Sequence, residues 1–417
     1  MNTIYLDSRK DILFIANYWH FEHEKSSSRY RTFADLLVKD FDLEVITSNF
    51  CHMKKTHRKT KELNLNELPY QMTLLPEHGY KRNISFKRIY SYIQFGNHVL
   101  RYLKKRKKPD AIIVSVPTLT VADKVIKYAN KNKIPVILDV QDLWPEAFKM
   151  ALNIPVLSDV LFAPMMVQEN RIYKNADKIV AVSDTYVKRA LKYNKKDTSG
   201  LSIYIGTDSE LVLNKTEGIT IEKPEAEFWI GYAGALGHSY DIKVVLNALK
   251  IIKDSGITTI KFQVMGTGPL IEEFMRYAKE LDVNCNFYGV LDYGVMMKML
   301  MLCDVAVNPI VGRSVASIIN KVSDYAAAAL PVINTQNSEE YRNLLEKYRA
   351  GMNVKNGNAT EIAHAIMTLY EDEALKDTMK ENAFRLYQDK FDRQKNYVLL
   401  TELIHSTINQ KNESINQ

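Results

Sequence analysis

The chain has only three cysteines in 417 residues, Cys51, Cys285 and Cys303. They are odd in number, far apart and not spaced as metal ligands, which argues against a disulfide scaffold and against a cysteine-based zinc site. Such sparse cysteine usage is typical of proteins from a reducing compartment. We therefore expect a cytoplasmic location.

Long apolar runs are also missing. No stretch reaches the roughly 20 apolar residues that a membrane-spanning helix needs, and residues 1–11 are too polar for a secretory signal. The net charge of +7 is too small to indicate a nucleic-acid partner. With 46% hydrophobic and 25% charged residues, the composition predicts an ordinary globular protein of two or three domains.

The positive charge is concentrated in segment 81–108, which ends in five consecutive basic residues at 104–108. Apolar residues such as Phe86, Ile89 and Ile93 roughly follow helical spacing. A basic amphipathic helix is typical of a protein that lies on a membrane surface. The alternative is a helix that packs on its own core and has a solvated basic end. A second basic tract, 54–61, is expected to form a mobile loop.

Short apolar runs alternate with amphipathic stretches along the whole chain, which predicts an α/β protein with parallel sheets. Buried strands are expected at 11–16, 43–47, 109–115, 134–139, 178–182, 228–233, 260–265, 283–288, 304–307 and 331–333. A charged segment that contains glycine and proline, 205–226, lies between the two halves. We expect the domain boundary there.

Three consecutive strands of the second half end in glycine, and the next strand ends in Asn308-Pro309. The glycines stand at Gly234 and Gly237, at Gly266 and Gly268, and at Gly289. The carboxyl ends of parallel strands meet at one edge of a sheet, and a glycine turn before a helix brings backbone N–H groups up to a phosphate. A single turn of this kind is common, so the prediction of a phosphate site depends on the turns occurring together at one edge.

The segment 308–335 contains a helix rich in small residues, with Asn320, Lys321 and Asp324 near its start. Asn320 and Asp324 are four residues apart, so they share a helix face at the edge where open α/β sheets bind ligands. The plain alternative is that Lys321 and Asp324, three apart, form a surface ion pair worth a few tenths of a kcal/mol.

The first half offers two weaker candidates. The serines at 26–28 precede a predicted helix, 29–38, and a capped helix start is a natural anion site. The strand 134–139 runs into a stretch with Asp142 and Glu146, which we interpret as the lip of a site; the alternative is that Asp142 only caps a helix. Asp40-Phe41-Asp42 is interpreted as a turn rather than a metal site.

Taken in order, these motifs resemble those of the family 4 retaining glycosyltransferases of the GT-B fold, of the bacterial capsule and O-antigen type. The motifs that carry the resemblance are Val140–Glu146, Ala176–Ser183, Ile205–Asp208, Tyr232–Gly237, Met265–Pro269, Phe287–Val290, Asn320–Tyr325 and Leu330–Ile333. The resemblance implies two Rossmann-like domains that face each other across a cleft. Residues 1–205 would form the acceptor-side domain, 206–390 the nucleotide-sugar domain, and 391–417 a C-terminal crossover helix and tail.

The resemblance further implies that a sugar moves, with retention, from a UDP-linked donor to a lipid-linked or glycan acceptor in surface polysaccharide synthesis. Lys321, together with Asp142 and Glu146 on the acceptor side, would serve catalysis. The donor would be bound by Ser27, Ser28, Gly234, Gly237, His238, Gly266, Gly268, Val290, Leu291, Asn320 and Asp324. No metal or other cofactor is expected, because cations and helix termini can stabilise a leaving diphosphate.

Several positions depart from the family pattern. The paired glutamates become Ala316 and Asp324, the Arg and Lys of the phosphate turn become Ala235 and Tyr240, and a first-domain His becomes Gln141. Two alternatives therefore stay open: a nucleotide-sugar 2-epimerase on the same fold, and a non-catalytic nucleotide-sugar-binding subunit. A polyprenyl-diphosphate-linked acceptor would suit segment 81–108 and a peripheral place on the inner face of the cell membrane.

Overall fold

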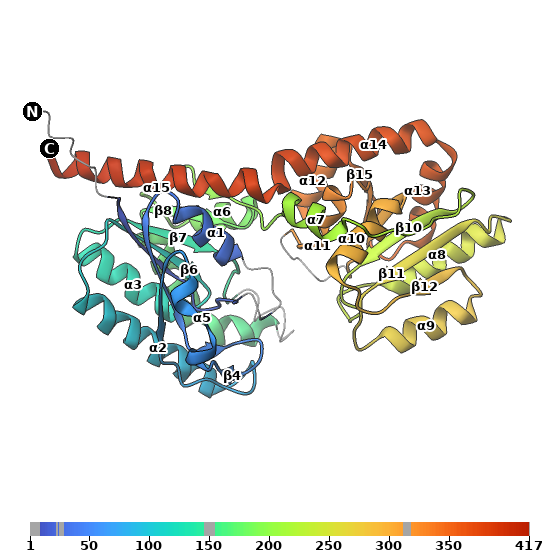
Figure 1. Cartoon of the computed structure of the whole chain (residues 1–417). Helices are drawn as coiled ribbons and strands as arrows, with labels where there is room; N and C mark the ends of the chain where they lie inside the picture. The colour runs from blue at the N-terminus through green and yellow to red at the C-terminus, as the bar shows by residue number, and fades with distance from the viewer. Residues whose placement is uncertain (1–8, 22–23, 25–28, 146–154, 312–317, 417) are drawn as a thin grey trace, which may run out of the picture. The chain divides into compact units, whose positions relative to one another are not determined.

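The computed structural model describes residues 9–21, 24, 29–145, 155–311 and 318–416 (Figure 1). The chain divides into two compact units, Met1–Ile203 with Tyr397–Gln417, and Tyr204–Asn396. Each unit is built on a parallel sheet with helices on both faces, which confirms the prediction of an α/β protein with two Rossmann-like domains. Within the described residues, no helix is long and apolar enough to cross a membrane.

The sheet of the first unit has the strand order β5-β2-β1-β6-β7-β8-β9. The strands are β1 Asp11–Ile15, β2 Asp42–Ser48, β5 Gln71–Leu75, β6 Ala111–Val116, β7 Val136–Val140, β8 Lys178–Ala181 and β9 Leu201–Ser202. Counted along the chain, the first six follow the order 3-2-1-4-5-6 of a doubly wound dinucleotide-binding sheet. Strands buried on both faces need nearly continuous apolar runs, which is why the sequence reveals β1, β6 and β7 so clearly.

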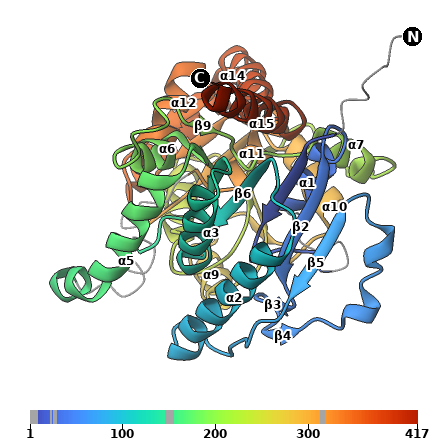
Figure 2. The ribbon, with the colours of Figure 1, turned by 90° about the vertical axis from the view of Figure 1, so that its left-hand side faces the viewer.

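Successive residues of a strand face opposite sides of a sheet, and the two cores of this unit follow that rule. Leu13 and Ile15 pack with α2 (Phe86–Lys105), α3 (Leu119–Lys131) and α5 (Pro155–Asn175), whereas Ile12 and Phe14 pack with α1 (Arg29–Leu37) and α15 (Arg393–Asn416). Figure 2 shows α2 and α3 next to each other. A further helix of this unit is α6, Asp184–Leu191.

The helix α15 returns the chain to the first unit. Its residues Tyr397, Leu400, Ile404 and Ile408 recur at helical spacing and are all buried in the core that contains Phe33 of α1. The predicted return of the C-terminal helix to the first domain is therefore confirmed, and a short π-helix at Tyr387–Phe391 precedes it.

The sheet of the second unit has the order β12-β11-β10-β13-β14-β15, again 3-2-1-4-5-6 along the chain. The strands are β10 Phe228–Ala233, β11 Ile260–Met265, β12 Cys285–Phe287, β13 Val305–Asn308, β14 Val332–Asn334 and β15 Gly351–Asn353. The helices are α7 Ser209–Thr216, α8 Ile242–Asp254, α9 Ile271–Glu280, α10 Tyr293–Leu302, α11 Lys321–Ala327, α12 Glu339–Tyr348, α13 Ala359–Glu371 and α14 Glu373–Leu386.

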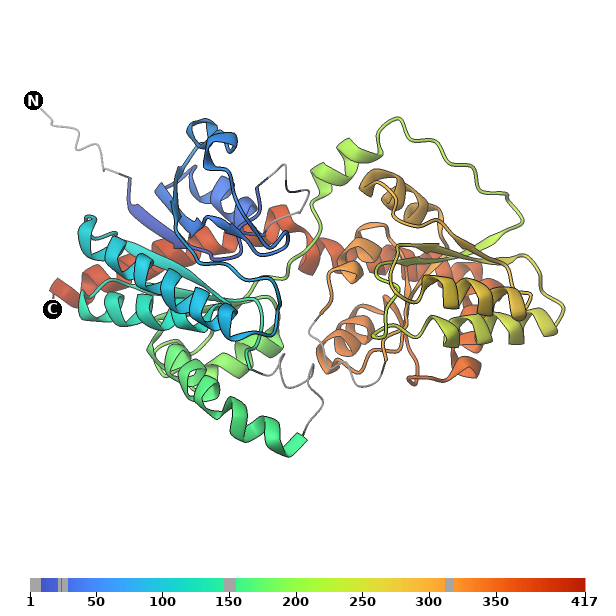
Figure 3. The same cartoon turned by 90° about the horizontal axis from the view of Figure 1, so that it is seen from below.

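These helices divide between the two faces of the second sheet. Helices α8, α9 and α13 share one core, while α10, α11, α12 and α14 share the other. Helices α8 and α9 run side by side (Figures 1 and 3). Side chains cap several helix starts by accepting a backbone N–H, among them Asp208, Asp241, Ser338, Asn358 and Asp372.

The expectation of a mobile loop at 54–61 is wrong. Phe50–Cys51 (β3) pairs antiparallel with Thr56–His57 (β4), and a short 3-10 turn follows at Thr60–Glu62. Arg58 is almost wholly buried and its guanidinium contacts the Glu24 carboxylate at 3.0 Å. It also donates to the carbonyls of Ser48, Phe50 and Trp19. A buried charge needs such partners, and their distance in the sequence hid this structure from pattern analysis.

Other short elements were also not predicted, namely β5, β9 and α7. Strands of two to five residues with partly exposed side chains carry too little periodicity to be recognised.

Candidate functional site

The three glycine turns of the second unit lie against one another at the carboxyl edge of its sheet, as the sequence predicts. The Gly234 amide donates to the Met265 carbonyl at 2.9 Å, and the Gly266 amide donates to the Gly289 carbonyl at 2.7 Å. A Cβ atom on Gly266 would lie 1.8 Å from the Gly234 oxygen, so no larger residue fits there. The close packing of the turns therefore explains the glycines by itself, whether or not a ligand binds there.

Lys321 lies beneath the first of these turns. Its Nζ is 4.0 Å from the ring centre of Tyr232 and 3.8 Å from that of Tyr240. A Cβ atom on Gly234 would approach Nζ to 2.8 Å. The Nζ atom is buried and has no hydrogen-bond partner among the described residues, and burial holds its pKa well below the ordinary value. The alternative of a surface pair with Asp324 is wrong.

Asp324, on the same helix as Lys321, is held by two hydroxyl groups. Its Oδ1 accepts hydrogen bonds from Thr207 Oγ1 at 2.7 Å and from the Tyr293 hydroxyl at 3.0 Å. Burial raises the pKa of the carboxyl group, and the two hydroxyl donors oppose that rise. No described residue donates to Oδ2, so that oxygen is left to accept from a ligand.

The helix that carries both residues is tied to the sheet by Tyr325. The Ala233 amide, at the end of β10, donates to the Tyr325 hydroxyl at 3.0 Å. This bond joins α11 to the strand whose glycine turn covers Lys321. The structure therefore brings Gly234, Lys321 and Asp324 into one site.

The other predicted donor residues of the second unit lie on the same edge. Val290 and Leu291 follow Gly289, and Val290 is 75% exposed. Gly237 and His238 precede Tyr240, whose amide donates to the Gly237 carbonyl at 3.0 Å. Asn320 is exposed at the start of α11. Gly268 packs against the backbone of Leu236.

An asparagine ladder at the same edge was missed from the sequence. Asn308, Asn334 and Asn353 end three neighbouring strands in register. The Asn308 amide donates to Asn334 Oδ1 at 2.9 Å, and the Asn334 amide donates to Asn353 Oδ1 at 2.9 Å. The recurrence of asparagine at the ends of predicted strands was the available signal.

In the first unit, Asp142 follows β7 at the carboxyl edge of the sheet. Its carboxylate accepts a hydrogen bond from the Trp144 indole at 3.0 Å. Gln141, which stands where the family pattern has a histidine, donates to Asp139 Oδ2 at 2.7 Å. Ser27, Ser28, Glu146 and Ala316 lie outside the described residues.

Two features of the first unit were missed because their members are far apart in the chain. The guanidinium of Arg88 lies 5.0 Å from the Trp144 ring centre and donates to Tyr92 and Tyr18. Arg29, the first residue of α1, forms a buried ion pair with Asp139 at 3.1 Å. Both sets lie at the edge that we expect to face an acceptor.

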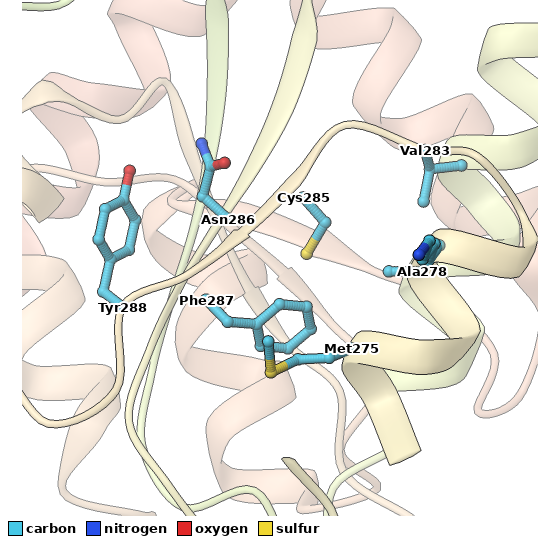
Figure 4. A pocket seen from close by; sticks show the side chains of 8 residues that line it. Met275, Ala278, Val283, Cys285, Asn286, Phe287 and Tyr288 are labelled. Atoms are coloured by element: carbon cyan, nitrogen blue, oxygen red, sulfur yellow. The ribbon is translucent and has the colours of Figure 1, made fainter. Parts of the chain in front are cut away.

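A pocket of about 470 Å³ opens between α9 and β12 (Figure 4). Met275, Cys285 and Phe287 are among its lining residues, and burial raises the pKa of the Cys285 thiol. None of the predicted donor-binding residues lines it. Across the described ranges, no three His, Cys, Asp or Glu side chains are grouped as metal ligands.

Solved structures define the class of fold. The chain is similar to Anabaena Alr3699/HepE in complex with UDP, with 14% identity over 95% of this chain and 100% of that chain and a TM-score of 0.65. It is similar to the sucrose-phosphate synthase of Thermosynechococcus elongatus, with 15% identity, coverage of 95% and 99%, and a TM-score of 0.67. These likenesses show that the fold is that of the GT-B glycosyltransferases.

A third similar structure is WaaG, a glycosyltransferase involved in lipopolysaccharide biosynthesis, with 16% identity, coverage of 94% and 99%, and a TM-score of 0.59. Residues 227–372 match the family described as Glycosyl transferases group 1. The matched residues include Gly234, Lys321 and Asp324. No curated protein sequence matches the chain significantly.

Proposed function

We propose that the protein is a hexosyltransferase that takes its sugar from a UDP-linked donor bound at the carboxyl edge of the second sheet. The observation that carries this proposal is the buried Lys321 amine, which has no hydrogen-bond partner among the described residues and lies beneath a glycine turn. A buried cation without a partner is costly, and an anionic ligand would supply the missing partner. The similarity to HepE in complexes with UDP and with UDP-glucose supports a UDP-linked donor.

In this proposal each group of the site has one role. Lys321 stabilises the negative charge that develops on the leaving diphosphate, as a preorganised positive group does in a transition state. Asp324 accepts hydrogen bonds from the ribose hydroxyls through Oδ2, while Thr207 and Tyr293 hold Oδ1. The backbone of Val290 and Leu291 meets the base.

We further propose the chemistry of the family 4 enzymes, in which the sugar is transferred with retention. In this proposal the buried lysine supplies the stabilisation that the diphosphate needs, so no essential metal is required. The leaving phosphate would itself accept the proton of the acceptor hydroxyl. Asp142 and Glu146 would orient the acceptor.

The acceptor that we propose is a lipid-linked or glycan molecule of surface polysaccharide synthesis, of the capsule or O-antigen type. The similarity to WaaG supports this class of pathway. A lipid-linked acceptor would place the protein in the cytoplasm with one surface on the inner face of the cell membrane.

The test is donor turnover by the full chain and by Asp324→Asn, with UDP-sugars and a membrane fraction that supplies acceptors. The asparagine keeps the shape of the side chain but removes its charge, so we expect kcat/KM to fall about 10- to 100-fold, which corresponds to ~1.5–3 kcal/mol. NMR of the product would report the anomeric configuration.

Three outcomes would overturn parts of the proposal. Unchanged turnover in Asp324→Asn would remove the assigned role of that carboxylate. An epimerised nucleotide sugar formed without any acceptor would indicate the 2-epimerase. Donor binding without turnover would indicate a non-catalytic subunit.

A further inference from the structure

Several exposed large apolar side chains of the first unit lie at or near the amino end of α2. Ile84 is 66% exposed and Phe86 is 91% exposed, and Ile89, Tyr90 and Ile93 are exposed as well. Met53, 70% exposed, lies in the turn between β3 and β4. We call Met53, Ile84, Phe86, Ile89, Tyr90 and Ile93 the α2 apolar patch.

The turn that carries Met53 lies beside the chain that leads into α2. Lys55 Nζ is 5.0 Å from the ring centre of Tyr80, and the ring of His52 packs against the same tyrosine. The ring of His78 packs on Tyr90 at 5.2 Å between centres. Figures 1 and 2 both show β4 near the amino end of α2. The patch is therefore one surface built from two segments.

Helix α2 is apolar on both faces in its first half only. The inward face carries Tyr92, Phe95, Val99 and Leu103, all buried. The outward face begins with the apolar residues of the patch and then continues as Asn97, Arg101 and Lys104. A helix that only covered its own core would be polar along the whole outward face, so the alternative of a simple solvated helix does not explain the patch.

Basic residues surround the patch and acidic residues are missing from it. Lys54, Lys81, Arg82 and Lys87 are exposed beside it, and no Asp or Glu occurs anywhere from residue 78 to 109. At 1.5 Å per residue, Lys104 lies roughly 27 Å along the helix from Phe86. The basic run at 104–108 is thus separate from the patch. The membrane surface predicted from the sequence over 81–108 is therefore limited to the amino end of α2.

We propose that the α2 apolar patch docks the protein on an anionic lipid surface, with the apolar side chains in the interface and the four cations on lipid phosphates. Lysine and arginine next to an interfacial apolar face are what an anionic bilayer attracts. The choice of a lipid surface rests on the proposed function, since a lipid-linked acceptor would lie there. A protein partner or a second copy of the chain are the other possible occupants, and the experiment separates them.

The experiment is co-sedimentation of the full chain with vesicles of phosphatidylcholine and phosphatidylglycerol, and with vesicles of phosphatidylcholine alone. We expect binding to the anionic vesicles only, weakened by high salt. The double variant Phe86→Ser/Ile89→Ser should bind at least about tenfold more weakly, because two large apolar side chains no longer enter the interface. Both side chains are exposed, so the fold should be kept.

The matched control is Val167→Ser/Leu213→Ser, which removes two exposed apolar side chains from other helices and should leave binding unchanged. A second pair of variants separates the charges. Neutralising Lys81, Arg82 and Lys87 to glutamine should weaken binding, whereas neutralising Lys104, Lys105 and Lys107 should have a smaller effect.

Three results would overturn the proposal: no vesicle binding by the full chain, equal binding by Phe86→Ser/Ile89→Ser, or a dimer that this variant disrupts in the absence of lipid. Thermal stabilisation by UDP-sugars is measured on the same samples. If the donor stabilises the protein but vesicles do not bind, the docking surface is wrong while the proposed transferase stands.

Discussion

Lys321 is the residue on which the account depends most. Lys321 packs between the rings of Tyr232 and Tyr240, and no residue that the structure describes forms a hydrogen bond with its Nζ. Burying an amine in this way costs free energy. Burial also raises the pKa values of both tyrosines, so neither supplies a negative charge near neutral pH. The proposed donor would supply the anion that the described residues around Lys321 do not provide.

The lowered pKa of Lys321 predicts that donor binding takes up protons at pH values above the Lys321 pKa of the free protein. A bound diphosphate favours the charged amine and raises its pKa, so affinity should fall as pH rises above the pKa of the free protein. Isothermal titration with UDP in two buffers of different ionisation enthalpy measures the uptake. Identical heats in the two buffers, after correction for dilution, would show that Lys321 is already charged before the ligand arrives.

The same group makes stability depend on pH in a defined direction. Between its lowered folded pKa and its ordinary unfolded pKa, the unfolded chain binds more protons at Lys321 than the folded chain does. The free energy of unfolding therefore increases as pH rises through that window. This gain in stability is lost as pH falls through the folded pKa.

At this scale the sequence predicts which residues meet a ligand but not how they are held. The spacing of Asn320, Lys321 and Asp324 on a helix start indicates one helix face, and the structure places Lys321 and Asp324 in one site. The partners of these side chains lie far away in the sequence, from 31 residues for Tyr293 to 117 residues for Thr207, with Tyr232 and Tyr240 in between. Local pattern carries no information about such contacts.

At the scale of elements, the glycine turns set the geometry of the edge. The turns after β10 and β11 approach so closely that the backbone oxygen of Gly234 occupies the space that a Cβ atom on Gly266 would need. Gly234 and Gly266 also have positive φ angles of 147° and 143°, a conformation that other residues rarely adopt.

We predict that Gly266→Ala destabilises the second unit by several kcal/mol, on the order of 3 kcal/mol, from the steric contact together with the unfavourable φ. Gly256→Ala is the matched control, because Gly256 has φ of 95° with nothing within 4 Å of the added Cβ. Denaturant unfolding compares the two variants. Equal free energies of unfolding would mean that the close approach of the turns is not a constraint.

Most strands and helices follow from the sequence because buried parallel strands and amphipathic helices leave strong periodic signals. The β3–β4 hairpin does not, since it is held by Arg58 and its buried partners rather than by an apolar pattern. The three asparagines of the ladder can be read in the sequence, but their contacts depend on the register of the three strands, which the sequence alone does not give.

At the scale of the whole molecule, the last helix belongs to the first unit although it follows the second in sequence. Tyr397 is fully buried, and its ring centre lies 4.5 Å from that of Phe33. The resemblance to a known family predicted this return, whereas the periodicity of the tail alone indicated only a helix.

We predict that Tyr397→Ala destabilises the first unit by about 3–5 kcal/mol, because it leaves a large cavity in the core. The neighbouring Val398→Ala is the control, since Val398 is 43% exposed and its truncation should cost under about 0.5 kcal/mol. Thermal unfolding of both variants measures the difference. A loss in Tyr397→Ala no larger than that in Val398→Ala would contradict the anchoring role of α15.

The most direct test of the central claim is a thermal-shift panel of nucleotide sugars, with and without EDTA, on the natural protein and on Lys321→Met. The methionine fills the space of the lysine stem without the amine, so the ligand-free variant should melt at the same temperature or higher. We predict that a UDP-sugar stabilises the natural protein, that EDTA leaves this shift unchanged, and that the shift is largely lost in Lys321→Met. An equal shift in Lys321→Met would contradict the proposed donor site, and loss of the natural protein's shift with EDTA would contradict metal-independent binding.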